Sequence, residues 1–169
     1  MAARDLIIDP TTLNLDQPIY GVEEIRKYNL QRFEMEHLTG ILLIQRERNV
    51  LVGYKDLSDQ EFWCRGHMPG YPIMPGVIMC EAAAQLASFY TQKFDLLGAE
   101  VVGFGGLDEV SFRGPVLPGD KLVLAVEMLR CRRGAMVVCR FQGFVNNVLR
   151  VDGKIKGIPL PLHPSTKFD

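Results

Sequence analysis

Residues 75–93 read Pro75-Gly-Val-Ile-Met-Cys-Glu-Ala-Ala-Ala-Gln-Leu-Ala-Ser-Phe-Tyr-Thr-Gln-Lys93, and this stretch decides the fold. Pro75 can begin a helix because its missing N–H costs nothing there, and Lys93 suits the exit end, so we expect one helix over about 76–93. Nearly every side of this helix is apolar, and we expect it to be buried all round. Its four alanines, within residues 82–87, allow the backbone of a sheet to approach closely.

Short apolar runs separated by turn residues lie on both sides of this helix. Because most strands follow the helix and the connections between them are short, the pattern predicts an α+β fold with an antiparallel sheet. The glycines at 103, 105 and 106 are followed by no helix, so they indicate a bend in a strand and not a phosphate-binding loop. The expected strands are 41–46, 50–55, 101–104, 109–112, 121–130, 135–144 and 148–158, with a short helix over about 21–28.

The length and composition limit the class of protein. The chain has 169 residues, the size of one domain, and a net charge of −1, which gives no field suited to nucleic acid or to an anionic membrane. We see no signal peptide and no stretch that would span a membrane, so we expect a cytoplasmic protein whose four cysteines are reduced thiols. We expect an irregular arm over 1–20, one domain over 21–158 and a loose tail over 159–169.

Glu81 is the one acid on the apolar helix. A buried lone carboxylate must find hydrogen-bond partners or become protonated. Gln85 follows four residues later on the same face and is placed to hydrogen-bond the carboxylate. The alternative is that Glu81 faces solvent at a seam or pairs with an arginine. The helix by itself leaves both readings open, and the preceding loop favours a functional role.

His67 lies in that loop, which three prolines make stiff. Histidine exchanges protons near neutral pH. The start of the helix presents free N–H groups and a partial positive charge, which would polarise a carbonyl oxygen placed there. A carboxyl group in an apolar wall, as expected for Glu81, is suited to donate a proton. A base, an oxyanion site and an acid are what is needed to remove a proton next to a carbonyl and expel a β-hydroxyl group.

Two motifs resemble a known family. The run His67-Met-Pro-Gly-Tyr-Pro-Ile-Met-Pro-Gly-Val-Ile-Met-Cys-Glu-Ala-Ala-Ala-Gln85 resembles the active-site signature of the β-hydroxyacyl-acyl-carrier-protein dehydratases of the FabZ type. The run Leu107-Asp-Glu-Val-Ser-Phe-Arg-Gly-Pro-Val-Leu-Pro-Gly-Asp120 resembles a strand and turn of the same family. Weaker similarity extends over roughly residues 22–158. Two motifs in the family's order are far more specific than a lone histidine or a lone glutamate.

The resemblance implies a role for each residue of the first motif. His67 is the base, Glu81 acts on the β-hydroxyl group, and Gln85 orients Glu81. The backbone N–H of Gly76, with Val77 beside it, binds the thioester carbonyl. The related isomerising dehydratases carry Asp where this chain has Glu81, so the resemblance is to the simple dehydratases.

The resemblance also implies the fold, the substrate and the assembly. The fold is a hotdog fold, in which a curved antiparallel sheet wraps one long helix. The substrate is a (3R)-hydroxyacyl thioester on acyl carrier protein or coenzyme A in fatty acid biosynthesis, and no cofactor or metal is required. The working unit is a homodimer in which His67 of one subunit faces Glu81 of the other, and such dimers often form trimers of dimers.

The segment Leu30-Gln-Arg-Phe-Glu-Met-Glu-His-Leu38 departs from the family pattern L-P-H-R-Y-P-F-L-L-V-D. Because this segment helps to shape the site and the dimer, the acyl chain length and the carrier do not follow from the sequence. His37 in this segment and His163 in the tail have no evident partners and are expected to be structural or solvated. Three histidines without ligand spacing predict no metal site.

Two other functions remain open for a chain with this fold. A thioesterase would also use a carboxylate near the helix, to activate water, but the His67 loop argues against it. A non-catalytic acyl-binding protein would be expected to lack His67 or Glu81, and both are present.

Overall fold

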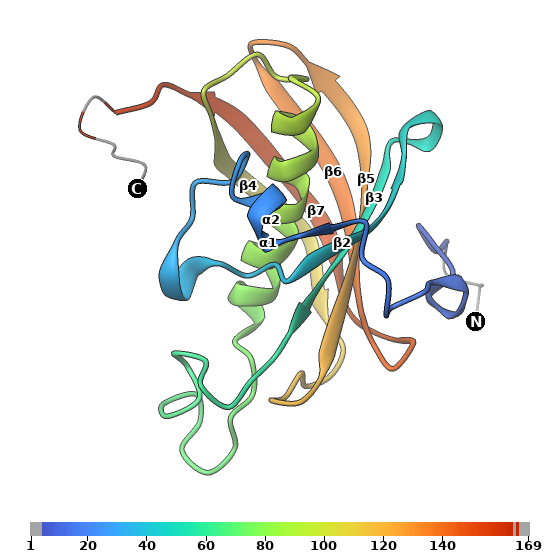
Figure 1. The fold of residues 1–169 in the computed structure, drawn as a ribbon, viewed down its shortest axis with the longest axis vertical. Coiled ribbons are helices and arrows are strands. Elements are labelled where there is room, and N and C mark those ends of the chain that lie inside the picture. Colours follow the sequence, from blue (N-terminus) through green and yellow to red (C-terminus); the bar gives the residue numbers. More distant parts are fainter. Residues whose placement is uncertain (1–4, 164, 166–169) are drawn as a thin grey trace.

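A curved sheet of seven strands wraps around one long helix, α2, in a computed structural model that describes residues 5–163 and 165 (Figure 1). The strand order is β1-β2-β3-β5-β6-β7-β4, and every neighbouring pair is antiparallel. This is the predicted α+β hotdog fold. The strands are β1 Tyr20–Gly21, β2 Gly40–Gln45, β3 Val50–Asp56, β4 Val101–Phe112, β5 Lys121–Arg132, β6 Met136–Val145 and β7 Val148–Leu160; the helices are α1 Val22–Ile25 and α2 Gly76–Lys93, with 3-10 turns η1 Pro10–Thr12, η2 Phe33–Met35 and η3 Arg46–Arg48.

Helix α2 has the predicted bounds, but it is not buried on every side as predicted. Its packed face is fully covered, whereas Val77 is 70% exposed and Glu81, Ala84 and Ser88 are half-buried. These four positions share one face of the helix because they recur at a spacing of three or four residues. The prediction that the helix is buried all round is therefore wrong for the single chain, since the curved sheet and the segment 22–38 cover the other faces and leave this stripe open. Here these four residues are called the open stripe.

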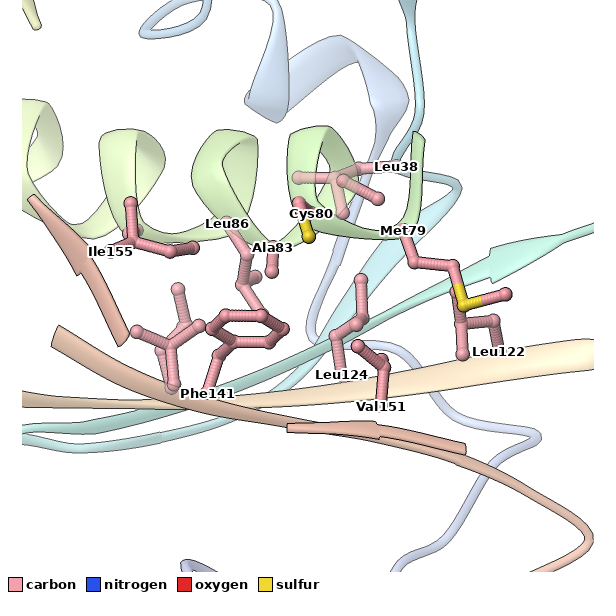
Figure 2. Close-up of a cluster of buried hydrophobic side chains, with 14 of the residues drawn as sticks. Leu38, Met79, Cys80, Ala83, Leu86, Leu122, Leu124, Phe141, Val151 and Ile155 are labelled. Atoms are coloured by element: carbon pink, nitrogen blue, oxygen red, sulfur yellow. The ribbon is translucent and has the colours of Figure 1, made fainter. Parts of the chain in front are cut away.

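The main core lies between α2 and the concave face of the sheet. Figure 2 shows Ala83 and Leu86 of the helix facing Phe141 and Leu124 of the strands, and all four side chains are buried. The helix lies close to β3 at Gly53, where a Cβ atom would come within 2.7 Å of Leu86 Cδ1. Because Gly53 has no side chain, α2 can lie close to the sheet at this point. This close packing sets the distance from the sheet at which α2 holds Glu81.

The predicted runs 101–104 and 109–112 form one strand, β4. Its register against β7 shifts between Phe104 and Gly106 and again between Asp108 and Ser111. The glycine-rich part is therefore a bend within a strand, as predicted, and the two runs are not separate elements, because pairing with β7 carries the strand through the bend. β7 continues to Leu160, beyond the predicted end at 158, and α1 is shorter than the predicted 21–28.

The N-terminal arm packs on the convex face of the sheet, away from α2 (Figure 1). Ile7 is fully buried, its N–H donates to Gln142 Oε1 at 2.9 Å, and its carbonyl accepts from Arg48 Nη2 at 2.9 Å. The described part of the arm is mostly irregular but includes η1 and the first residue of β1, and it is an integral part of a second apolar cluster. We call this the outer cluster, which consists of Ile7, Leu42, Val50, Val52, Tyr54, Val123, Ala125 and Phe144.

Residues 1–4 of the predicted arm, and residues 164 and 166–169 of the predicted tail, lie outside the described part. Within the described residues, no helix is both long and apolar enough to cross a membrane.

Because Ile7 is buried in the outer cluster, we expect its truncation to destabilise the protein. Ile7→Ala is expected to lower the free energy of unfolding by about 2–4 kcal/mol, because it opens a cavity in the outer cluster. Leu6→Ala is the matched control, since the neighbouring Leu6 is 40% exposed. Urea unfolding of both variants at one fixed protein concentration measures the difference. Equal stability of the two variants would mean that the arm does not support the sheet.

Candidate active site

His67 lies in the loop between β3 and α2, and two hydrogen bonds fix it there. Its backbone N–H donates to the Trp63 carbonyl at 2.7 Å. Its ring Nδ1 lies 2.9 Å from the Ile73 carbonyl oxygen. A carbonyl can only accept, so Nδ1 carries the ring proton and the other nitrogen, Nε2, keeps its lone pair. The loop therefore selects the tautomer in which Nε2 is available as a base.

The N-terminus of α2 supplies hydrogen-bond donors beside His67. The Pro75 carbonyl accepts from the N–H groups of Ile78 and Met79, at 2.9 and 3.3 Å. Within the described residues, the N–H groups of Gly76 and Val77 donate to no other group, as expected at the first turn of a helix. The loop and the helix start enclose one cavity of about 560 Å³, here called the base cavity. Its lining includes His67, Ile73, Gly76, Val77 and Phe112.

Glu81 lines a different cavity, here called the acid cavity, of about 200 Å³ between α2 and strands β4, β6 and β7. Gln85 Nε2 donates to Glu81 Oε1 at 2.9 Å, so the predicted contact between these two side chains is present. Its lining combines polar residues, among them Gln31 and Lys156, with a larger number of small and apolar ones. The lining also includes Ala84, Ala87, Ser88, Val102, Phe104, Val137, Cys139 and Ile155.

The divergent segment 30–38 holds Gln85 in place. The Gln85 amide oxygen accepts from the His37 backbone N–H at 2.9 Å, and its amide nitrogen donates to the Met35 carbonyl at 2.8 Å. Sequence reasoning missed both contacts. His37 lies 48 positions from Gln85 along the chain, and no local pattern marks a pairing of this kind. His37 itself is fully buried, which agrees with the structural reading of this residue.

The two predicted catalytic side chains do not meet within one chain. His67, Gly76 and Val77 line the base cavity, whereas Glu81 and Gln85 line the acid cavity. No hydrogen bond or ion pair joins His67 to Glu81 in the part of the chain that the structure describes. One chain thus holds His67 and the free N–H groups of Gly76 and Val77 in one place, and Glu81 with its hydrogen-bonded partner Gln85 in another.

The buried thiols near the site are not activated. Burial raises the pKa of the Cys139 thiol to about 12 and that of Cys80 to about 11. A thiol with so high a pKa is protonated at neutral pH and is a poor nucleophile. Cys80 therefore serves as core packing, where it is 2% exposed.

His37 predicts a pH dependence of stability. Burial first, and then the nearby charge of Lys55, lower its pKa from 6.5 to about 4, while Glu61 opposes this. Between these two pH values the unfolded chain binds a proton that the folded chain does not, so the stability rises with pH. His37 contributes about 3 kcal/mol to the free energy of unfolding above pH 6.5, and this contribution is lost as the pH falls to about 4.

Urea unfolding at a series of pH values from 7.5 to 4 measures this effect. His37→Leu removes the titrating group and is expected to flatten the pH dependence over that range. The same pH dependence in both proteins would contradict the assignment to His37.

Comparisons with known proteins point to one family. A family model described as the FabA-like domain matches residues 29–154. The 3-hydroxyacyl-acyl-carrier-protein dehydratase FabZ of Mannheimia succiniciproducens is 40% identical over 129 residues, which are 72% of this chain and 80% of that protein. The protein of the same name from Sodalis glossinidius is 36% identical over 145 residues, which are 85% of this chain and 91% of that protein.

Solved structures resemble the fold at low sequence identity. The dehydratase heterocomplex ApeI:P of Xenorhabdus doucetiae matches with a TM-score of 0.69 and 12% identity, over 80% of this chain and 90% of that chain. The PaaI protein of the E. coli phenylacetic acid degradation operon matches with a TM-score of 0.54 and 13% identity, over 70% of this chain and 80% of that chain. At this level of identity the matches support the fold alone.

Proposed function

Because this chain belongs to the FabA-like family, we propose that His67 of one subunit and Glu81 of another act together in its reaction. The chain is a 3-hydroxyacyl-acyl-carrier-protein dehydratase of the FabZ type, which converts a (3R)-hydroxyacyl thioester to the trans-2-enoyl thioester in fatty acid biosynthesis. One observation carries the proposal for the site. The base and the acid line separate cavities of one chain, so a second chain is needed to bring them together.

Strand β4 supports a dimer as the working unit. It lies at one edge of the sheet, pairs with β7 alone and runs for 12 residues. Phe104, Leu107 and Phe112 on this strand are 47%, 40% and 52% exposed. A long apolar edge strand is a template for pairing with another chain. In a two-fold dimer the same edge would meet its own copy, which extends the sheet across both subunits.

The open stripe of α2 supports the same assembly. Val77 and Glu81 lie on this stripe and are left partly exposed by the sheet of their own chain. We propose that the second subunit covers the stripe and brings its own His67 loop toward Glu81. A trimer of such dimers, which the family resemblance implies, would keep each site between the same two chains.

The first half of the reaction uses the base cavity. His67 Nε2 takes a proton from C2 of the substrate, and the electron pair of that C–H bond moves toward the thioester carbonyl. The N–H group of Gly76, with that of Val77 beside it, donates to the carbonyl oxygen as negative charge develops. The hydrogen bond from Nδ1 to Ile73 holds the imidazole in place while it gains the proton.

The second half uses Glu81 of the other subunit. Glu81 donates a proton to the C3 hydroxyl group, the C3–O bond breaks, and water leaves as the C2–C3 double bond forms. Gln85 donates to Oε1 of Glu81, so the acidic proton is carried by Oε2, which is free to face the substrate. Afterwards His67 holds the extra proton and Glu81 is ionised, and exchange with solvent restores both groups.

One assay tests this function. The purified chain is mixed with a 3-hydroxyacyl-acyl-carrier-protein, and the ultraviolet absorbance of the conjugated enoyl thioester is followed together with the release of free thiol. We expect the absorbance to rise with no thiol released, and the reverse reaction from the enoyl thioester to lower it. Release of thiol without an enoyl product would identify a thioesterase, and tight binding with neither product would identify an acyl-binding protein.

We also propose that the protein acts in the cytoplasm, where its substrate's carrier protein would be found with other soluble enzymes of the pathway. The state of its cysteines supports this location, because Cys64, Cys80, Cys131 and Cys139 are all free thiols.

A further inference from the structure

We propose that His37 is a positioning residue for both halves of the reaction, because it supports Glu81 through Gln85 and supports the His67 loop through Trp63. This inference rests on the proposed site between two chains, because only in such a dimer does one His37 lie next to residues of two different sites. His67 and Glu81 of one chain would serve two different sites of the dimer. His37 of that chain would contact Gln85, which holds Glu81, and Trp63, which holds His67.

The first link runs from His37 to Glu81. The His37 N–H donates to the amide oxygen of Gln85, and the Met35 carbonyl accepts from the amide nitrogen. A flipped amide would place its NH₂ group against an N–H and its oxygen against a carbonyl, so the two contacts allow one orientation. That orientation points the amide N–H at Glu81, at 2.9 Å. The position of the His37 backbone therefore decides which atom Gln85 presents to the acid.

The second link runs from the His37 ring to the His67 loop. The ring is fully buried and lies 6.1 Å from the Trp63 ring and 6.4 Å from the Phe62 ring, measured between centroids. Trp63 is 3% exposed, and its backbone carbonyl accepts from the N–H groups of Gly66 and His67, at 3.0 and 2.7 Å. The Trp63 residue thus packs on His37 through its side chain and holds His67 through its backbone.

The His37 ring supports the two segments by filling the space between them, and not by hydrogen bonding or charge. Neither ring nitrogen has a hydrogen-bond partner within the described residues. The lowered pKa of about 4 keeps the imidazole neutral throughout the working range of a cytoplasmic enzyme. A neutral ring that forms no hydrogen bond can be replaced by an apolar side chain of similar size, whereas truncation leaves a cavity that lets both supported segments shift.

A mixed dimer with one intact site tests each link separately. One subunit carries His67→Asn and supplies Glu81, and its partner carries Glu81→Gln and supplies His67. His37→Ala is then placed in one subunit at a time. In the first subunit it acts through Gln85, and in the second through Trp63. We expect each placement to lower kcat by about tenfold or more with little change in KM, because the reacting groups are displaced while the acyl-binding surfaces are not.

Two control variants separate positioning from loss of stability. His37→Leu fills the same space and is expected to restore kcat in both placements. Leu42→Ala opens a cavity in the outer cluster, none of whose residues lines either cavity of the site in the described part of the chain, and is expected to leave kcat unchanged. Circular dichroism and urea unfolding establish that every mixed dimer is folded at the assay temperature.

The outcomes distinguish this inference from the function on which it rests. An active parent mixed dimer whose kcat does not respond to His37→Ala in the His67-supplying subunit would overturn the link through Trp63, and no response in the other subunit would overturn the link through Gln85. A parent mixed dimer without activity would refute the shared site instead. The role of His37 is then decided in the wild-type background, where an unchanged kcat in His37→Ala would overturn it.

Discussion

Glu81→Gln is expected to lower kcat for dehydration by about three orders of magnitude, because the amide has the shape of the acid but no proton to donate. The fold should be unaffected, since an amide oxygen at this position can still accept the hydrogen bond from Gln85 Nε2 that the carboxyl accepts now. The measurement is the initial rate of enoyl-thioester formation at saturating substrate. The KM should change little, because in the proposed reaction Glu81 acts on the hydroxyl group and not on the acyl chain.

Glu47→Gln is the matched control for this variant. Glu47 is an exposed acid in η3 that lines neither cavity, and its replacement removes one charge away from the site. It should retain wild-type kcat. A Glu81→Gln enzyme with near wild-type turnover would show that the acid role is wrong.

His67→Asn is expected to cause a loss of similar size, about a thousandfold in kcat, because asparagine has no basic nitrogen. Its amide N–H can still donate to the Ile73 carbonyl in place of Nδ1, so the loop should keep its conformation. Substrate deuterated at C2 identifies the step that is lost. The primary isotope effect on kcat should rise in His67→Asn, since removal of this proton becomes rate-limiting, and should not rise in Glu81→Gln.

His163→Asn provides the control at a second histidine. His163 is exposed and contacts Ser165 near the end of the chain, so its replacement should leave both kcat and the isotope effect unchanged. Turnover by His67→Asn comparable to this control would rule out His67 as the base.

The elements best predicted from the sequence are those whose ends have a local physical cause. Pro75 allows α2 to begin at Gly76, and the predicted end at Lys93 agrees with the structure. Strands β3 and β7 begin where predicted because Asn49, Asn146 and Asn147 adopt the left-handed conformation that ends the preceding turn. The hydrogen bond between Gln85 and Glu81 was likewise predictable, since the spacing of four residues places both on one helix face.

The rest depends on contacts between distant parts of the chain. The division of one strand, β4, into two predicted runs followed from its glycines, and the pairing with β7 that joins them has no local signature. The packing of Ile7 on the outer cluster involves a partner, Gln142, that is 135 positions away. The prediction that α2 is buried all round rests on the apolar composition of the helix as a whole, and composition does not distinguish burial within a chain from a surface that a second chain would cover.

A site built from two chains can be reconstituted from two kinds of subunit that are each inactive alone. His67→Asn and Glu81→Gln chains carrying different affinity tags are produced together, and the mixed dimers are isolated by both tags. Each mixed dimer would contain one site with an intact His67 and Glu81 and one site with neither, so we expect about half of the wild-type kcat per dimer. Mixed dimers no more active than the two parent variants would contradict it, because they would mean that His67 and Glu81 act within one chain.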